Sequence, residues 1–289
     1  MPGKFACMAG GPLCRALESG QLSARELGRL NTPFGPSEVI LRVDDAPVPF
    51  YLMPRQLPGG PRLGASQINY RATLYALKDL GVEAVLNWAA AGAVTHDLGV
   101  GQILLPSDLI DLTSRRPMTF FEKHGLGLLR QFPVFCPALR GALEEVLAEL
   151  KLDFHTGGTA AVTEGPRLET PAEVRMLAGF GAEVVTHMLA PEVFLAKELQ
   201  MCLAGACYLV NYAETGSRYR PFSTGELFGG LTTASQAERL RRVCQALPEL
   251  LRRLAEKVAS AERTCECHNT MAGHIHKDNL PEDWHRWFD

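Results

Sequence analysis

We read the fold from one stretch of the chain, Glu164-Gly165-Pro166-Arg167-Leu168-Glu169-Thr170-Pro171-Ala172-Glu173. Its Gly-Pro pair interrupts the apolar segment that precedes it. Thr170 is a favourable helix N-cap, Pro171 suits the first helical position, and Glu173 stands three residues past the cap. The stretch therefore predicts a strand end, a tight turn and the start of a helix.

Glu169 is the carboxylate of this stretch that we consider a candidate functional residue. A carboxylate held at such a turn can face a pocket whose walls are fixed by the neighbouring strand and helix. The other interpretation, in which the glutamates of the stretch are only capping groups, stays open on spacing alone.

The length and composition favour one large α/β domain over two small ones. The chain has 289 residues, of which 46% are hydrophobic and 21% charged, so it can bury a substantial core. We expect one domain over residues 1–264 and a tail of unknown role over residues 265–289. The net charge of -3 and the pI of about 6.3 imply no general attraction to nucleic acid or to an anionic membrane. No signal pattern is present and no apolar run approaches roughly 20 residues, so we expect a cytoplasmic protein without nucleic-acid or membrane partners.

The eight cysteines lie mostly in apolar contexts, which favours reduced core thiols over a disulfide framework. Their one local cluster is Cys265-Glu266-Cys267, followed by His268, His274 and His276. This arrangement lacks the C-x₂₋₄-C spacing of structural zinc sites, so we predict no metal site. A redox-active or strained pair in an exposed tail is the alternative that the spacing leaves.

Alternating strand and helix patterns predict an α/β fold with a twisted, mixed, mostly parallel central sheet flanked by helices. The expected strands are Lys4–Met8, a hairpin of Val39–Val43 and Pro47–Met53, Ala84–Trp88, Gln102–Leu105, Val184–Thr186 and Ala204–Val210. The expected helices are Asn69–Leu80, Pro137–Leu150, Pro191–Met201 and Ala234–Ala261.

Ligands of such folds bind beyond the carboxyl ends of the strands, and several candidate residues occupy those ends. They are Gly11, Arg55, Ala89, Glu169 and His187. The Gly-Gly turn at Gly11 and the small residues at Ala89 can offer backbone N–H groups to an anion, and Arg55 can offer a guanidinium. A solvated loop arginine is the alternative for Arg55.

Asn211 ends another predicted strand. Its amide can accept and donate at once, which suits a heterocycle that presents both C=O and N–H edges. A turn-forming asparagine is the alternative.

Taken together, several collinear stretches between about residues 5 and 262 resemble the trimeric purine nucleoside phosphorylase family, and within it the methylthioadenosine phosphorylase branch. The stretches are Thr32-Pro33-Phe34-Gly35, Asn69-Tyr70-Arg71-Ala72, Asp108-Leu109-Ile110-Asp111, Arg116-Pro117-Met118-Thr119-Phe120, residues 164–173 and Pro191-Glu192-Val193-Phe194-Leu195-Ala196-Lys197-Glu198.

The resemblance implies a homotrimer in which phosphate attacks the anomeric carbon of a purine nucleoside, with phosphate as co-substrate and no cofactor. It places Leu168, Glu169, Asn211 and Ala213 around the base, with Glu169 at the N1 edge and Asn211 at N7 and the 6-substituent. Relatives specific for 6-aminopurines carry aspartate where this chain has Asn211, and a second aspartate where it has Ala213. The resemblance therefore favours a 6-oxopurine nucleoside, and it gives Asn211 and His187 the catalytic roles.

On the phosphate side the resemblance implies a set of contacts in which this chain departs from the family. The set is Gly11, Arg55, Gln56, Ala89, Ala90 and Met188, with His187 and Met188 also against the sugar. Hydroxyl residues of the family are replaced at Gly11 and Met188, its histidine is replaced by Gln56 or Leu57, and His187 stands in place of a methionine.

Three functions follow as alternatives from these departures. They are a phosphorylase with an altered anion site, a nucleosidase or other pentosyl-transferring relative in which His187 orients the nucleophile, and a non-catalytic nucleoside-binding homologue. Tyr219, Arg220 and Phe222 are candidates for the pocket of the 5′ substituent.

Overall fold

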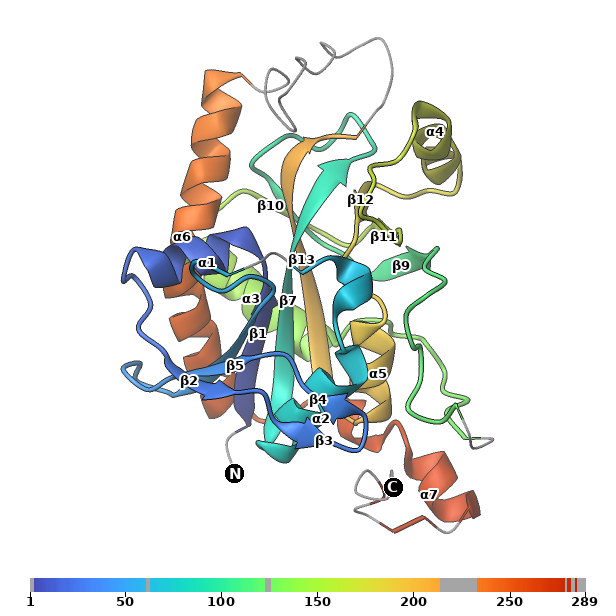
Figure 1. Ribbon diagram of the computed structural model, residues 1–289. Helices are drawn as coiled ribbons and strands as arrows, with labels where there is room; N and C mark the ends of the chain where they lie inside the picture. The colour runs from blue at the N-terminus through green and yellow to red at the C-terminus, as the bar shows by residue number, and fades with distance from the viewer. Residues whose placement is uncertain are drawn as a thin grey trace.

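A mixed sheet of eleven strands forms the centre of the computed structural model, which describes residues 3–60, 63–122, 126–213, 233–278, 280–281 and 284 (Figure 1). Its strands follow the order β10-β8-β13-β7-β1-β6-β5-β2, and β12, β11 and β9 continue from the far end of β7. Their bounds are β1 Lys4–Ala9, β2 Arg25–Gly28, β5 Ile40–Val43, β6 Phe50–Pro54, β7 Val82–Ala93, β8 Ile103–Leu105, β9 Asp108–Asp111, β10 Phe154–Thr156, β11 Thr159–Val162, β12 Val184–Thr186 and β13 Cys202–Tyr212. A separate small pair joins β3 Asn31–Thr32 to β4 Gly35–Pro36.

The pairing confirms the predicted fold class. Strand β1 is parallel to β6 and β7, and β13 is parallel to β7, whereas the hairpin β5–β6 and the pair β12–β7 are antiparallel. Crossover helices are what parallel neighbours require, and they cover both faces of the sheet.

Helices α1 Gly11–Glu18, α3 Pro137–Glu149 and α6 Ala234–Ser260 pack together on one face, and α2 Tyr70–Asp79 and α5 Glu192–Glu198 pack on the other (Figure 1). Successive side chains of β1 point to opposite faces of the sheet and so contribute to both cores. Phe5 and Cys7 join the first core, and Ala6 and Met8 join the second. Helices α4 Pro171–Gly179 and α7 Ala272–Asp278 lie apart from these two layers, and short 3₁₀ turns occupy Ala65–Gln67 and Cys267–Asn269.

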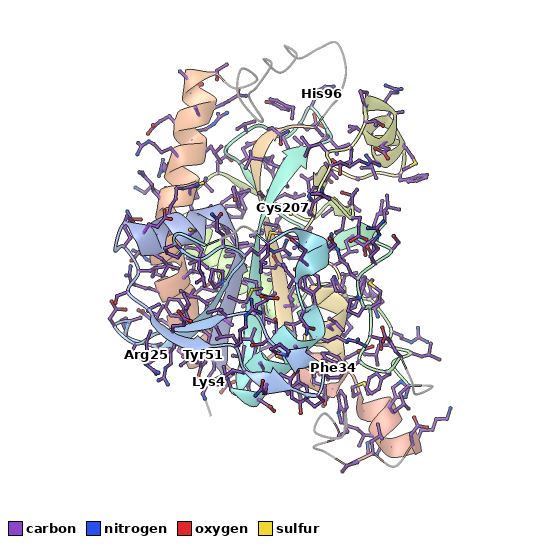
Figure 2. All side chains as sticks on the ribbon, in the orientation of Figure 1. Lys4, Arg25, Phe34, Tyr51, His96 and Cys207 are labelled. Carbon is purple, nitrogen blue, oxygen red and sulfur yellow. The ribbon has the colours of Figure 1, made fainter. Side chains whose placement is uncertain are left out.

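Side chains fill the space between the sheet and its helices (Figure 2). Cys207 of β13 lies deep in the sheet, and burial raises the pKa of its thiol to about 12, so that it stays neutral. Phe34 lies beside α2, where its ring contacts Tyr75 and Phe120 at centroid distances of 5.9 and 5.1 Å. All eight cysteines are free thiols.

The predicted helices are confirmed to within a few residues where capping signals exist. Asn69 caps α2 through Ala72 N, and Gly81 follows that helix with a φ of 80°. Thr170 and Glu173 form the reciprocal capping box at the start of α4.

Three predicted boundaries are wrong. The Gly-Gly-Pro turn after β1 is not a loop but opens helix α1. Strand β7 does not end at Trp88, because the small residues that follow stay paired with β13 and then also with β12. Helix α5 covers only Glu192–Glu198 of the predicted 191–201.

The segment after Cys265 packs against the domain instead of extending from it as an exposed tail. Cys265, Met271 and Trp284 are only 6%, 0% and 3% exposed. The Trp284 ring lies 5.3 Å from the Phe121 ring, which belongs to the long connection between β9 and α3. Across the described ranges, the helices are all too short or too polar to cross a bilayer.

Glu198, the last residue of α5, anchors this long connection. Its carboxylate accepts hydrogen bonds from Thr119 Oγ1 at 2.6 Å and from the Phe120 N–H at 2.8 Å, and the residue is 4% exposed. Burial raises the pKa of Glu198 to about 7, although both hydrogen bonds oppose the shift.

We therefore expect a pH dependence of stability that Glu198→Gln removes. Between an unfolded pKa of about 4.3 and the folded value near 7, the folded state binds more protons, so the free energy of unfolding falls as pH rises through this window. Relative to wild type, Glu198→Gln should gain roughly 2 to 3 kcal/mol between about pH 5 and pH 8. Urea unfolding across this range measures the gain, and a constant difference between the two proteins would contradict the expectation.

Candidate active site

Strands β1 and β6 end together, and β7, which pairs with β1 on its other side, continues past them to Ala93. Ala9 of β1 pairs with Pro54 of β6 and with Trp88 of β7, and the Arg55 N–H donates to the Ala9 carbonyl at 2.9 Å. Gly10 and Arg55 therefore lie next to each other, and Ala89 lies on the other side of Gly10, one strand further from Arg55.

Helix α1 begins directly at this edge. Gly10 is its N-cap without a side-chain hydrogen bond, and the N–H groups of Leu13 and Cys14 both donate to the Gly10 carbonyl. The N-terminal end of an eight-residue helix carries partial positive charge, so an anion beside Gly11 is favoured.

Arg55 belongs to a buried polar cluster. Its Nη2 donates to Glu192 Oε1 at 2.9 Å and to Tyr70 OH at 3.4 Å, and Asn87 Nδ2 donates to the same Glu192 oxygen at 3.0 Å. Arg55 is 7% exposed, and Asn87 and Glu192 are fully buried. Arg55 Nε, Asn87 Oδ1 and Glu192 Oε2 are buried without a hydrogen-bond partner. The cluster thus retains a hydrogen-bond donor and two acceptors that a polar ligand or water can use.

Two guanidinium groups approach the Tyr70 ring. Arg55 lies 6.0 Å and Arg116 5.9 Å from its centroid. Burial, with the Glu192 charge adding to it, raises the pKa of Tyr70 to about 12 against the opposing effect of both arginines. Tyr70 therefore stays a neutral phenol, and it donates to the Ala65 carbonyl at 2.8 Å.

Arg116 connects the two loops that follow β11 and β12. Its guanidinium donates to the carbonyls of Thr163, Glu164, His187 and Ala190 at 2.6 to 3.0 Å, and its Nε lies 3.1 Å from Glu164 Oε1. Its side chain is 1% exposed. One buried arginine therefore fixes the position of His187 relative to the turn at residues 163–164.

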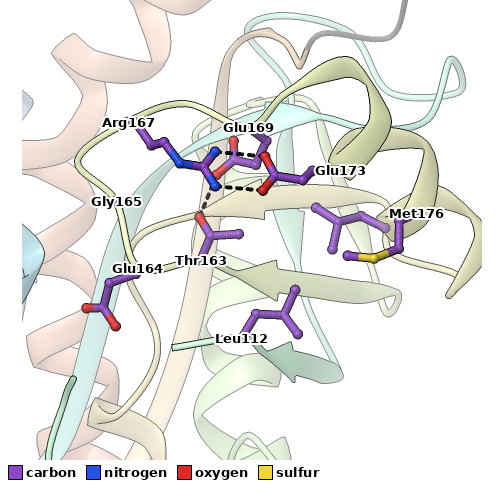
Figure 3. A pocket seen from close by; sticks show the side chains of 9 residues that line it. Leu112, Thr163, Glu164, Gly165, Arg167, Glu169, Glu173 and Met176 are labelled. Atoms are coloured by element: carbon purple, nitrogen blue, oxygen red, sulfur yellow. Dashed lines mark hydrogen bonds and ion pairs between the residues drawn. The ribbon is translucent and has the colours of Figure 1, made fainter. Parts of the chain in front are cut away.

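A cavity of about 170 Å³ opens beside this turn (Figure 3). It is lined by Leu112, Thr163, Glu164, Gly165, Arg167, Glu169, Glu173, Met176 and Leu177. This volume is below the roughly 300 to 1,000 Å³ of typical small-molecule pockets, so the cavity holds only part of a nucleoside-sized ligand.

Glu169 is the carboxylate of the cavity that also meets a second candidate residue. Its Oε1 accepts from Thr163 Oγ1 at 2.5 Å and lies 3.4 Å from His187 Nε2. Burial acts to raise the pKa of Glu169, but the hydrogen bonds from His187 and Thr163 outweigh it and leave the pKa below its ordinary value. Glu169 is therefore ionised at neutral pH and acts as a hydrogen-bond acceptor.

The two neighbouring glutamates have structural partners. Glu173 caps α4 and pairs with Arg167 at 2.6 Å, as Figure 3 shows. Glu164 accepts from the N–H groups of Ser114 and Arg115 at 2.8 and 3.0 Å, besides Arg116. The capping interpretation thus holds for Glu173, and Glu169 differs from both because it reaches His187.

His187 and Asn211 flank the far part of β7. Thr186, just before His187, pairs with Ala91 of β7, and Asn211 pairs with Gly92. A Cβ on Gly92 would lie 3.2 Å from Asn211 Oδ1, and one on Gly165 would lie 2.7 Å from His187 Nδ1. Glycine at both positions lets the backbone approach the two side chains closely.

The other predicted site residues fall in varied surroundings. Ala89 is fully buried, whereas Ala90 is exposed and its carbonyl accepts from Thr186 Oγ1 at 2.8 Å. Met188 is 7% exposed.

Gln56 is half-buried, and Ala213 is 8% exposed, with its N–H donating to Ala93. Leu168 is 39% exposed and does not line the cavity. Tyr219, Arg220 and Phe222 lie outside the described residues.

Sequence reasoning assigned no role to four residues of the site: Tyr70, Asn87, Arg116 and Glu192. Asn87 carried a usable signal, because it is a polar residue inside the apolar run of a predicted buried strand. Glu192 carried a weaker one, as an acidic residue among apolar neighbours at a helix start. Tyr70 and Arg116 belonged to stretches quoted for the family resemblance, without individual roles.

Comparison with known proteins places this geometry in context. The sequence profile of the phosphorylase superfamily matches residues 34–256. A probable S-methyl-5′-thioinosine phosphorylase of Methanopyrus kandleri is 35% identical over 244 residues, which cover 84% of this chain and 90% of that protein. A 6-oxopurine nucleoside phosphorylase of Pyrococcus furiosus is 31% identical over 252 residues, which cover 84% and 90%.

Among solved structures, a methylthioadenosine phosphorylase from an antarctic soil metagenomic library shares the fold. Its TM-score is 0.79 at 22% identity, with coverage of 93% of this chain and 91% of that one.

Proposed function

Because the chain belongs to the phosphorylase superfamily, we propose that it is a purine nucleoside phosphorylase, a pentosyltransferase that uses phosphate to cleave a 6-oxopurine ribonucleoside, deoxynucleoside or thionucleoside. One observation carries the proposal. The edge where β1 and β6 end, which carries Gly10 and Arg55, and the cavity at Glu169 are both connected to one strand, β7, through the pairing of that strand with β1 and β12. The names of the curated relatives support the substrate class.

In the proposed reaction a phosphate oxygen forms a bond to the anomeric carbon while the bond from that carbon to the purine nitrogen breaks. The electron pair of the broken bond goes to the purine ring. Arg55 and the backbone N–H groups near Gly11 hold the phosphate, and the Asn211 amide hydrogen-bonds to N7 as negative charge develops on the base. No cofactor is required.

The ionised state of Glu169 supports a 6-oxopurine. A 6-oxopurine carries a proton on N1, which a carboxylate can accept as a hydrogen bond, whereas N1 of a 6-aminopurine is itself an acceptor and repels a carboxylate. We assign His187, whose Nε2 lies 3.4 Å from Glu169 Oε1, to the sugar as well.

The first test is purine release from inosine, guanosine and methylthioinosine, with and without millimolar phosphate and with adenosine as the control. We expect release that requires phosphate and leaves adenosine nearly intact. Asn211→Asp is the matched variant. It should lower turnover of inosine and raise that of adenosine, because a carboxylate accepts from the 6-amino group but repels a 6-oxo oxygen. An unchanged preference would remove Asn211 from the base site.

Hydrolysis is the second candidate, and the contact of His187 with Glu169 favours it. An imidazole oriented by a carboxylate and 26% exposed can take a proton from water. Purine release at the same rate without phosphate would identify this activity. Nucleoside binding without any release would identify a non-catalytic homologue.

We further propose a cytoplasmic homotrimer that acts in purine salvage. Support for assembly comes from two apolar side chains of the long connection, Leu128 and Phe132, which are 87% and 93% exposed in the single chain. Sedimentation equilibrium should give three times the chain mass, and a monomer mass would contradict assembly.

A further inference from the structure

Four cysteines from three distant parts of the chain converge on one point. Cys136 precedes α3, Cys202 begins β13, and Cys265 and Cys267 follow α6. All four sulfur atoms lie within 4.8 Å of one another, and Cys202 Sγ is 3.4 Å from Cys265 Sγ. No other group of this kind exists among the residues that the structure describes.

The separations suit a shared metal ion. Zinc binds four thiolates tetrahedrally at about 2.3 Å, which puts the sulfur atoms about 3.8 Å apart. A disulfide requires about 2.05 Å, which is much shorter than the 3.4 Å between Cys202 and Cys265. The convergence of all four sulfurs is a requirement of a common ligand, whereas disulfides require only that each sulfur meet one other.

The surroundings of the cluster suit thiolates. Cys136 is the N-cap of α3, and its sulfur accepts from the Leu139 N–H at 3.4 Å. The side chains of Arg263 and Lys197 lie close enough to interact with Cys202 and Cys267, respectively. Two cations therefore stand beside a centre that would carry a net charge of two minus with zinc in place.

The cluster is also enclosed. Cys136, Cys202 and Cys265 are 3%, 7% and 6% exposed, and only Cys267 is half-buried. A small cavity of about 20 Å³ borders Cys136 and Cys267. Closed sites with four protein ligands are the structural type of zinc site, which leaves no open position for substrate.

We propose that Cys136, Cys202, Cys265 and Cys267 bind one structural zinc ion that fastens the segment after α6 to the sheet. Binding replaces the four thiol protons, which are released to solvent. The predicted absence of a metal rested on the short C-x-C spacing, and that spacing gave no sign of the two partners contributed by α3 and β13. His268, His274 and His276 take no part in the cluster.

The fastened segment makes further contacts that depend on its position. Thr270 Oγ1 donates to the Lys197 carbonyl at 2.6 Å, and Gln200 donates to the His268 carbonyl. Trp284 packs on Phe121. Zinc thus supports the fold of the long connection, not the chemistry at Arg55 and Glu169.

The experiment measures metal in the full-length protein purified under reducing conditions without added metal. We expect one zinc per chain by mass spectrometry, released stoichiometrically when thiols are blocked. Cobalt exchanged into the site should give the visible absorption of a tetrahedral thiolate complex. Cys267→Ser should lose most of the zinc, whereas Cys244→Ser, which removes another half-buried thiol outside the cluster, should keep it.

Native mass spectrometry of the unaltered chain tests whether it binds zinc even if Cys267→Ser fails to fold. A chain heavier by one zinc and lighter by the displaced protons supports the proposal. A metal-free chain overturns it, whether its four sulfurs are joined in disulfides or remain as thiols, and so does a chain that contains iron.

Discussion

Arg55→Met is expected to reduce phosphate-dependent purine release by more than about 100-fold and to lower the free energy of unfolding by roughly 3 to 5 kcal/mol. The loss of activity follows from the loss of a buried guanidinium at the strand-end edge beside Gly10. The loss of stability follows because Glu192, which is fully buried, would keep only Asn87 as a hydrogen-bond partner among the residues that the structure describes. Initial rates at varied phosphate and urea unfolding measure the two effects.

The double variant Arg55→Met with Glu192→Gln separates these two effects. It removes the unpaired buried carboxylate, so most of the lost stability should return while activity stays low and the KM for phosphate stays high. If the double variant regained phosphate-dependent turnover, Arg55 would be only the counter-ion of Glu192, and the anion site would have to lie elsewhere.

Glu169→Gln is expected to lower kcat/KM for inosine by roughly 10- to 150-fold, the equivalent of a charge-assisted hydrogen bond worth about 1.5 to 3 kcal/mol. The amide keeps the shape of the side chain but loses the charge that faces His187 and, in the complex, the N1 proton of the base. Steady-state kinetics and calorimetric binding of hypoxanthine measure the change.

Glu173→Gln is the matched control for that variant, because it neutralises a second carboxylate of the same turn and cavity. The partners of Glu173 are Arg167 and the Thr170 N–H, so we expect a much smaller change in kcat/KM. An equal loss in both variants would mean that the turn geometry, and not the Glu169 charge, supports activity.

Elements with local chemical signals could be predicted from the sequence. Thr170 and Glu173 indicate the start of α4, and Asn69 indicates the start of α2. Both helices begin where these caps indicate. Helix α1 was missed because its start, Gly10-Gly11-Pro12, has no capping side chain and reads equally well as a turn. The extension of β7 was missed because alanine and glycine have little strand preference, and the pairing of β7 on both sides overrides it.

Only part of the candidate site could be predicted from the sequence, for a related reason. His187 and Arg55 directly follow strands β12 and β6, as the strand pattern predicts, whereas Glu169 lies in the turn between β11 and α4. The residues that hold these side chains cannot be found from a strand pattern, because Glu192 reaches Arg55 and Arg116 reaches His187 across large sequence separations. The cysteine cluster shows the same limit, since Cys136 and Cys202 have no local signal that links them to Cys265.

Strand β7 also sets a fixed distance within the candidate site. Ala89, beside Gly10, and Gly92, which pairs with Asn211, are three residues apart on a strand that rises about 3.3 Å per residue, so their backbones are fixed about 10 Å apart. An inserted residue would turn every later side chain of β7 to the opposite face unless a bulge absorbed it, as the register shift between Leu209 and Asn211 of β13 does opposite the same stretch. Side-chain substitutions along this part of β7 therefore leave the distance between these two backbone positions unchanged.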